Sequence, residues 1–288
     1  MVKNSLNLFA TTDALCYNVI IYNNGVICMF SENKKRIVIK VGTSTLTHKT
    51  GKTNIKRVAS LVSVLSDLHN MGHEVVLVSS GAVGIGVGKL GLNSKPTTTK
   101  GLQAAAAIGQ CELMFLYDKM FSEYGVVVSQ LLFTTDALRP DGGRHHLLDT
   151  FNQLIEFGSI PIVNENDSVS VEELLNGDND CLSAQVAALI DADLLVLLTD
   201  TDGLYDSNPS ENENAKLISV VEEITPQIEA IAGGAGEKGT GGFATKVKAA
   251  KIANESNIPV VVMNGNNPDK IYNIINGEHI GTLFKAGN

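Results

Sequence analysis

The sequence predicts an α/β fold built around a largely parallel sheet. From Lys34 onward, short runs rich in Val and Ile alternate with longer segments of helical periodicity, which is typical of repeated βαβ units. Several of these apolar runs lead directly into glycine, serine or acidic residues, and open α/β sheets bind ligands at the carboxyl ends of their strands. The chain of 288 residues, 44% of them hydrophobic, suffices for one large domain or two smaller ones.

The elements follow one another without a dividing linker. The first strand is predicted at 36–41, and a helix at 53–70 follows, whose apolar residues recur every three or four positions and therefore form one stripe. Gly72 is expected to end this helix. Further strands are predicted at 74–78, 126–131, 160–163, 194–198 and 259–262, with helices near 102–121, 180–190 and 242–256. Residues 34–288 are therefore interpreted as one domain, with a substrate lobe and a nucleotide lobe.

Residues 1–33 do not continue this pattern. Their apolar stretch is interrupted by the turn signal Asn23-Asn24-Gly25, which breaks the core that a signal peptide needs, and no Arg suggests a transit peptide. We interpret them as an N-terminal extension, either a short hairpin or a disordered segment; a role in organelle targeting is the less favoured alternative.

Composition narrows the classes of partner and compartment. A net charge of −9 argues against general affinity for nucleic acid or for an anionic membrane, and the longest apolar runs are shorter than the ~20 residues of a membrane-spanning helix. The four cysteines are Cys16, Cys28, Cys111 and Cys181, which lie far apart without a C-x-x-C pair. This pattern favours free thiols in a reducing, cytoplasmic compartment and gives no basis for a zinc site.

The segment from Asn164 to Asp180 is the most informative of the chain. It holds six acidic residues and four asparagines and no Lys or Arg, and it follows directly on the apolar run 160–163. Side chains so rich in acceptors and amide donors suit a small zwitterion that carries an ammonium group and a carboxylate. The alternative is a solvated acidic loop, since like charges near 4 Å repel one another by ~4 kcal/mol at an effective dielectric of 20.

Two strand ends and one helix start carry residues suited to phosphate. Lys40 ends the first strand before Gly42, and Ser79-Ser80-Gly81 follows the second, so both turns can offer backbone N–H groups to an anion. The glycine-rich residues 239–246 precede a helix, with Lys246 near its start, where a cation is favourable only beside an anion. The alternatives are a surface lysine and a flexible glycine linker.

Other motifs are less specific. Asp200 follows the strand 194–198 and is predicted to hold a ribose or an adenine edge, although Asp202-Gly203 can equally be only a turn. Residues 86–91 have G-x-G-x-x-G spacing but begin eight residues after their strand, so a flexible loop is favoured over a dinucleotide site. The pair His145-His146 has no third ligand and is interpreted as lying in a solvated loop.

Taken together, these motifs resemble the amino acid kinase family from Lys34 to about Ala286. The segments that carry the resemblance are 39–44, 79–82, 104–110, 162–167, 177–180, 198–200 and 239–246. The paired segments Asn-Glu-Asn-Asp and Gly-Asp-Asn-Asp are similar to those of the branch that acts on glutamate. The resemblance implies a three-layer α/β/α sandwich with a mainly parallel central sheet and ATP-dependent phosphorylation of the γ-carboxylate of L-glutamate, the first step of proline biosynthesis.

The resemblance also implies roles for individual residues. Lys40 and Lys246 would hold the transferred phosphoryl group and Asp180 would orient them, whereas Ser80, Asp167 and Asn179 would bind glutamate. ATP would be bound by Lys40, Thr199, Asp200, Thr240, Gly241, Gly242, Phe243, Ala244, Thr245 and Lys246. Mg²⁺ would be carried largely by the nucleotide, without a dedicated protein ligand. A carboxylate nucleophile is already ionised at neutral pH, so such a reaction needs alignment and charge neutralisation rather than a general base.

The chain departs from the family at two further places. Residues 144–150 stand where relatives carry an Asn-Ala-Arg segment, and no C-terminal PUA domain, an RNA-binding-like module, is expected. These departures bear on effector response and subunit contacts, so inhibition by L-proline, a homo-oligomeric state and a partnership with glutamyl-phosphate reductase are implied only by the resemblance. The alternatives are a non-catalytic amino-acid sensor of the same fold and a kinase for a related amino acid.

Overall fold

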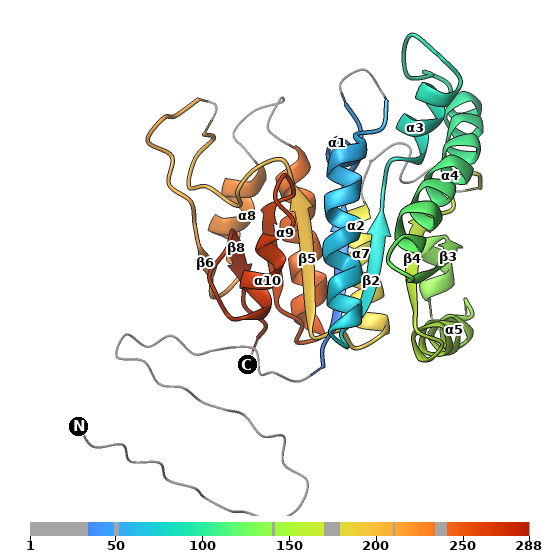
Figure 1. The fold of residues 1–288 in the computed structure, drawn as a ribbon. Helices are drawn as coiled ribbons and strands as arrows, with labels where there is room; N and C mark the ends of the chain where they lie inside the picture. Colours follow the sequence, from blue (N-terminus) through green and yellow to red (C-terminus); the bar gives the residue numbers. More distant parts are fainter. Residues whose placement is uncertain are drawn as a thin grey trace, which may run out of the picture.

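A computed structural model describes residues 34–48, 52–139, 142–169, 179–209, 211–233 and 241–287. Its centre is one eight-stranded sheet in the order β3-β4-β2-β1-β5-β7-β8-β6 (Figure 1). The strands are β1 (Arg36–Val41), β2 (Glu74–Ser79), β3 (Val127–Phe133), β4 (Ser159–Glu165), β5 (Leu194–Thr199), β6 (Val220–Val221), β7 (Val260–Asn264) and β8 (Thr282–Phe284). All neighbours pair in parallel except β7 with β8. The predicted, mainly parallel sheet is confirmed.

Helices cover both faces of this sheet. They are α1 (Thr43–Leu46), α2 (Ile55–Asn70), α3 (Ala82–Lys89), α4 (Thr99–Ser122), the 3-10 turn η1 (Thr135–Leu138), α5 (Arg144–Glu156), α7 (Asn179–Leu189), α8 (Pro226–Gly233), α9 (Gly241–Glu255) and α10 (Lys270–Ile275). Buried residues of α2, α4 and α10 pack on one face, and those of α5, α7, α8 and α9 on the other. In Figure 1, α2 lies in front of the sheet and α7 behind it, so the three-layer sandwich is confirmed.

Strand alternation decides which face each site residue reaches. Successive side chains of a strand point to opposite faces, and Ile37 and Ile39 of β1 belong to the core beneath α2. Val38 belongs to the core beneath α7 and α9. Lys40 shares the parity of Val38, so the strand directs its side chain towards α7 and α9. A one-residue slip of β1 would instead place the lysine under α2.

Helices α3 and α4 approach each other so closely that two glycines are required. A Cβ atom on Gly109 would lie 1.7 Å from the carbonyl oxygen of Ala82, and one on Gly86 would lie 1.9 Å from that of Ala105. This contact anchors α3, which begins directly after Ser80 and Gly81. The expectation of a flexible loop at 86–91 was therefore wrong, because Gly86 and Gly88 lie within α3.

The predicted strands and helices are present with ends shifted by a few residues, but several elements were missed. The pair His145-His146 lies in the first turn of α5, with ring centroids 3.7 Å apart, and not in a loop as expected. Helices α8 and α10 and the antiparallel strand β8 were also not predicted. The N-terminal extension 1–33 and residues 170–178 of the acidic segment lie outside the described residues.

Two features that would indicate other functions are not found in the described part of the chain. None of its helices is long and apolar enough to span a membrane. No group of three or more His, Cys, Asp or Glu side chains within it is placed to hold a metal ion.

We predict that Gly109→Ala destabilises the protein although alanine is the better helix former. The new Cβ would overlap the Ala82 carbonyl, and overpacking of this kind costs about 1–3 kcal/mol. The melting temperature should therefore fall by several degrees, at roughly 2–4 °C per kcal/mol for a domain of this size. Gly233→Ala in α8 is the matched control, since no atom lies within 4 Å of its added Cβ. An unchanged melting temperature for Gly109→Ala would contradict the close packing of α3 on α4.

Candidate active site

Three charged side chains from three elements meet at the carboxyl edge of the sheet. Asp180 lies in the first turn of α7, and its two carboxylate oxygens contact different lysines. Nζ of Lys40, from β1, lies 2.6 Å from Oδ1, and Nζ of Lys246, from α9, lies 3.0 Å from Oδ2. The hydroxyl of Thr245 also donates to Oδ2, at 2.8 Å. The structure thus brings together the three residues predicted to be catalytic.

The charges of this cluster are buried and unequal. Lys40, Asp180 and Lys246 are 6%, 2% and 8% exposed. Burial alone would raise the pKa of Asp180, but the ammonium groups of Lys40 and Lys246 outweigh it and hold that pKa below its usual value. With Asp180 ionised between two lysines, these three side chains sum to one positive charge. Two ammonium groups held side by side at the start of a helix favour an anionic ligand.

The position of α7 in the chain brings Asp180 to the middle of the sheet. Helix α7 belongs to the connection between β4 and β5, and this connection crosses β2 and β1 because these two strands lie between β4 and β5 in the sheet. Ser183 donates from its hydroxyl to the carbonyl oxygen of Asp180, at 2.6 Å, within the same helix. A carboxylate in the first turn is favoured by the helix dipole, which holds Asp180 in the position where it meets both lysines.

A second, uncharged network adjoins the charged cluster through the neighbouring residue Asn179. Its amide Nδ2 donates to Oγ of Ser80 at 2.9 Å and to Oδ1 of Asn164 at 2.7 Å. Asn164 in turn donates to Oε1 of Gln110 in α4, at 3.0 Å. All four residues are buried. The predicted substrate residues Ser80 and Asn179 are therefore in direct contact.

Gln110 and Asn164 received no individual role from the sequence. The signal for Gln110 was its helical position: it shares a buried face of α4 with Leu113 and Tyr117, three and seven residues further on. A glutamine on such a face needs a polar partner. Only the fold reveals that this partner is Asn164.

Two buried acceptor atoms, one in this network and one in the segment that follows β4, lack hydrogen-bond donors in the described part of the chain. Within the described residues, Oδ1 of Asn179 and Oδ1 of Asp167 accept no hydrogen bond, although both atoms are buried. A buried acceptor that lacks a donor costs about 1–3 kcal/mol. These two atoms are therefore suited to a ligand that donates hydrogen bonds.

The segment 164–167 is not a solvated acidic loop. Asn164, Glu165 and Asp167 are only 2%, 5% and 8% exposed. Burial and, to a smaller extent, the negative charge of Glu165 raise the pKa of Asp167 to about 6, against the opposing effect of Lys95. A cationic group bound beside these carboxylates would relieve their repulsion.

The residues predicted to bind the nucleotide base lie at the carboxyl end of β5. Thr199 donates from its hydroxyl to Oδ1 of Asp200 at 3.3 Å, and its carbonyl oxygen accepts from the N–H of Gly265 at 2.8 Å. Asp200 is exposed, and no hydrogen bond within the described residues joins it to the lysine cluster. The carboxylate of Asp200 is therefore accessible to a ligand at this edge of the sheet.

The glycine-rich segment contributes the start of α9. Gly241 and Gly242 begin the helix, and Phe243 packs partly against the core beneath α7 and α9. Ala244 is exposed, whereas Thr245 and Lys246 contact Asp180 as described above. Thr240 lies outside the described residues. The alternative of a flexible glycine linker is therefore wrong for residues 241–246.

Comparison with known proteins gives a consistent family. Residues 35–264 match the model of the amino acid kinase family. A glutamate 5-kinase of Clostridium perfringens is 53% identical over 260 residues, which cover 88% of this chain and 97% of that protein. One of Listeria monocytogenes serotype 4a is 52% identical over 260 residues, covering 88% and 94%. One of Moorella thermoacetica is 54% identical over 255 residues, covering 87% of this chain and 66% of that protein.

Solved structures share the fold at lower identity. An isopentenyl phosphate kinase of T. acidophilum superposes with a TM-score of 0.60 at 21% identity, covering 87% of this chain and 100% of that one. A UMP kinase of Bacillus anthracis superposes with a TM-score of 0.58 at 19% identity, covering 88% and 97%. On the family model, the sequence relatives and the shared fold, this chain belongs to the amino acid kinase family.

Proposed function

We propose that this protein transfers the γ-phosphoryl group of ATP to the γ-carboxylate of L-glutamate, giving L-glutamyl 5-phosphate, the first step of proline biosynthesis. The observation that carries the proposal is the buried pair of lysines, each held by one oxygen of Asp180. Relatives that are 52–53% identical over 88% of the chain bear the name glutamate 5-kinase. Residues 34–288 would form a single kinase domain.

The chemistry needs positioning and charge neutralisation. An oxygen of the ionised γ-carboxylate attacks the γ-phosphorus of ATP, a carboxyl O–P bond forms, and the bond to the oxygen that leaves with ADP breaks. No proton moves, so no general base is required. Lys40 and Lys246 would neutralise the charge that spreads over the phosphoryl oxygens and the leaving oxygen. Asp180 would act as a positioning residue that keeps the two ammonium groups apart and aimed.

The nucleotide would lie along the carboxyl edge from the lysines to β5. The start of α9 would face its phosphates, because a helix N-terminus favours anions, and Thr199 and Asp200 would contact the nucleoside. Mg²⁺ would supply further charge neutralisation, bound by the nucleotide phosphates rather than by a carboxylate cluster of the protein. The two ammonium groups would attract such a nucleotide, which the acidic residues nearby would otherwise repel.

Glutamate would complete the uncharged network. Its ammonium group donates three hydrogen bonds, and the buried Oδ1 atoms of Asn179 and Asp167 are acceptors that lack donors within the described residues. The positive charge would also offset the repulsion between Asp167 and Glu165. Ser80, already bonded to Asn179, would orient the substrate between this network and the lysines.

Self-association is a further part of the proposal. Strand β3 is at the edge of the sheet, with Val127 63% and Leu132 37% exposed. On the adjoining helix α4, Ile108 and Phe115 are 39% and 63% exposed and lie seven residues apart on one face. An unpaired strand edge beside an apolar stripe suits a second copy around a twofold axis. A monomer by light scattering at micromolar concentration would exclude this.

The reactivity of the product implies a partner reaction. An acyl phosphate is labile, so the reaction that consumes it should come quickly after its formation, and glutamyl-phosphate reductase is the proposed partner. L-Proline, the amino acid to which such a pathway leads, is the proposed inhibitor. Cys111 is an exposed free thiol, in keeping with the proposed cytoplasmic compartment.

Removing either lysine should abolish most turnover. We expect Lys246→Ala and Lys40→Ala each to lower kcat by roughly 10²–10³, the scale of losing one preorganised charge-stabilising group. The measurement is the formation of γ-glutamyl hydroxamate from L-glutamate, Mg-ATP and hydroxylamine, with aspartate and acetylglutamate as competing acceptors. Lys248→Ala, an exposed lysine two residues along α9, is the matched control and should retain activity. Near-normal turnover in both variants would rule out the assigned roles.

Asp167 is expected to lower the stability of the folded protein at neutral pH while it strengthens the binding of glutamate. Its pKa is about 6 in the folded protein and ~4 in an unfolded chain. Its contribution to the free energy of unfolding is therefore fully present below pH ~4 and is lost as the pH rises through about 6. Asn cannot ionise, so Asp167→Asn should be more stable than the wild type at pH 7–8, and the difference should disappear near pH 4. Urea unfolding at each pH measures it.

The same variant should bind glutamate more weakly, because the ammonium group loses a charged partner. A rise in the KM for glutamate, with the KM for ATP unchanged, is the expected kinetic result. Equal stability of both proteins at pH 8 would contradict the buried, strained state of Asp167.

A further inference from the structure

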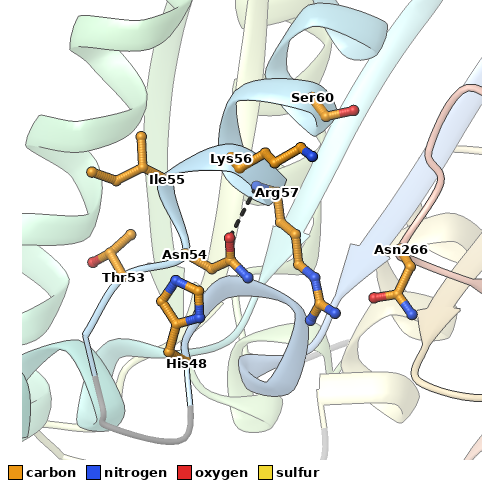
Figure 2. Close-up of a pocket in the computed structure, with 8 residues that line it drawn as sticks. All are labelled: His48, Thr53, Asn54, Ile55, Lys56, Arg57, Ser60 and Asn266. Carbon is orange, nitrogen blue, oxygen red and sulfur yellow. Dashed lines mark hydrogen bonds between the residues drawn. The ribbon is translucent and has the colours of Figure 1, made fainter.

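A cavity of about 530 Å³ opens beside the N-terminus of α2 (Figure 2). The residues that line it come from the connection between β1 and α2, from α2 itself and from the turn after β7. They are His48, Thr53, Asn54, Ile55, Lys56, Arg57, Ser60 and Asn266. None belongs to the lysine cluster or to the network of Asn179. Moreover, α2 packs on the opposite face of the sheet from α7 and α9.

The lining of this cavity is basic. Lys56 and Arg57 contribute two cations, His48 adds an imidazole, and no lining residue is acidic. The first turn of α2 carries no acidic residue either, so nothing in that turn offsets the positive end of the helix dipole. In a chain of net charge −9, this is a local reversal of sign. It favours an anionic occupant.

Asn54 gives an independent indication of a ligand. It is only 8% exposed, and its Oδ1 caps α2 by accepting a hydrogen bond from the N–H of Arg57, at 3.3 Å. This bond fixes the amide so that Nδ2 turns the other way, into the space between His48 and the guanidinium of Arg57 (Figure 2). Nδ2 makes no hydrogen bond to the described residues. The side chain of Asn54 is thus nearly buried, and its amide donor faces the cavity without an acceptor among the described residues.

We propose that this cavity binds a phosphate-bearing small molecule. The amide of Asn54, the ammonium of Lys56 and the guanidinium of Arg57 all line the cavity from the start of α2, and together they suit a tetrahedral oxyanion with several acceptor oxygens. The guanidinium also donates from Nη1 to the carbonyl oxygen of Ser44, at 3.2 Å, which fixes its position and leaves its other N–H groups for a ligand. The volume lies within the ~300–1,000 Å³ of small-molecule sites and leaves room for an organic group beyond the phosphate. Ile55, 63% exposed, offers that group an apolar contact.

Isothermal titration calorimetry at low ionic strength without nucleotide tests the proposal, with inorganic phosphate and glycerol 3-phosphate as phosphate probes and glutarate as the carboxylate probe. The decisive variant is Asn54→Asp. Aspartate caps a helix as well as asparagine does, so α2 is retained, but the donor is replaced by a negative charge. The melting temperature of this variant confirms that it is folded.

The matched control is Lys100→Ala. Lys100 is exposed and lies two residues after the N-cap Thr98 of α4, as Lys56 lies two residues after Asn54, but it does not line this cavity. Both phosphate probes should bind the wild type. Asn54→Asp should weaken binding at least roughly tenfold and Lys56→Ala several-fold, the scale of losing a hydrogen bond to a charged group, and Lys100→Ala should bind as the wild type does.

Repeating the titrations in the Lys246→Ala background separates this site from the kinase site. Phosphate binding that persists there and is still lost on Asn54→Asp supports the proposal, whatever the catalytic role of Lys246. Binding that is lost in Lys246→Ala but kept in Asn54→Asp would place the phosphate in the kinase site and overturn it. Glutarate binding as tight as that of glycerol 3-phosphate, with the same sensitivity to the variants, would overturn the assignment to phosphate.

Discussion

The buried contact of one carboxylate with two lysines is the constraint on which the rest of this structure depends. Asp180 is nearly inaccessible, and each of its oxygens faces a different ammonium group. Without the carboxylate, two buried like charges would face each other without compensation, at a cost of several kcal/mol. The parity of β1, the crossing of α7 and the start of α9 each contribute one member. These three elements must therefore be correctly placed at the same time.

The charges and the unsatisfied acceptors of the site indicate which ligands would complete it. Lys40 and Lys246 present two ammonium groups around one carboxylate, and the Oδ1 atoms of Asn179 and Asp167 are buried acceptors without donors among the described residues. An anion with several oxygens satisfies the first, and an ammonium group satisfies the second. Glutamate together with ATP supplies both, so substrate binding would relieve strain that the free protein holds. Such preorganisation costs stability, as the raised pKa of Asp167 illustrates.

The sequence predicted those parts of the fold that periodicity controls. The apolar run of β1 was placed at its observed bounds, and the stripe of α2 within two residues of its observed start. The sequence did not predict α3, which contains Gly84, Gly86 and Gly88 and therefore has little intrinsic helix propensity. The close contact with α4 stabilises this helix instead. Local patterns carry no information about a partner 23 residues away along the chain, which is the separation between Gly86 and Gly109.

The candidate site likewise has a part that the sequence predicted and a part that only the fold reveals. Lys40, Asp180 and Lys246 were identified by their motifs, whereas the burial of Asp167 and the chain from Asn179 through Asn164 to Gln110 follow only from the fold. The role of Asp180 is tested most directly by the kcat of Asp180→Asn, which keeps the shape of the carboxylate but removes its charge. We predict a folded protein that binds glutamate but turns over at least roughly a hundredfold more slowly, because the lysines lose their common anchor. Turnover equal to that of the wild type would contradict this role of Asp180.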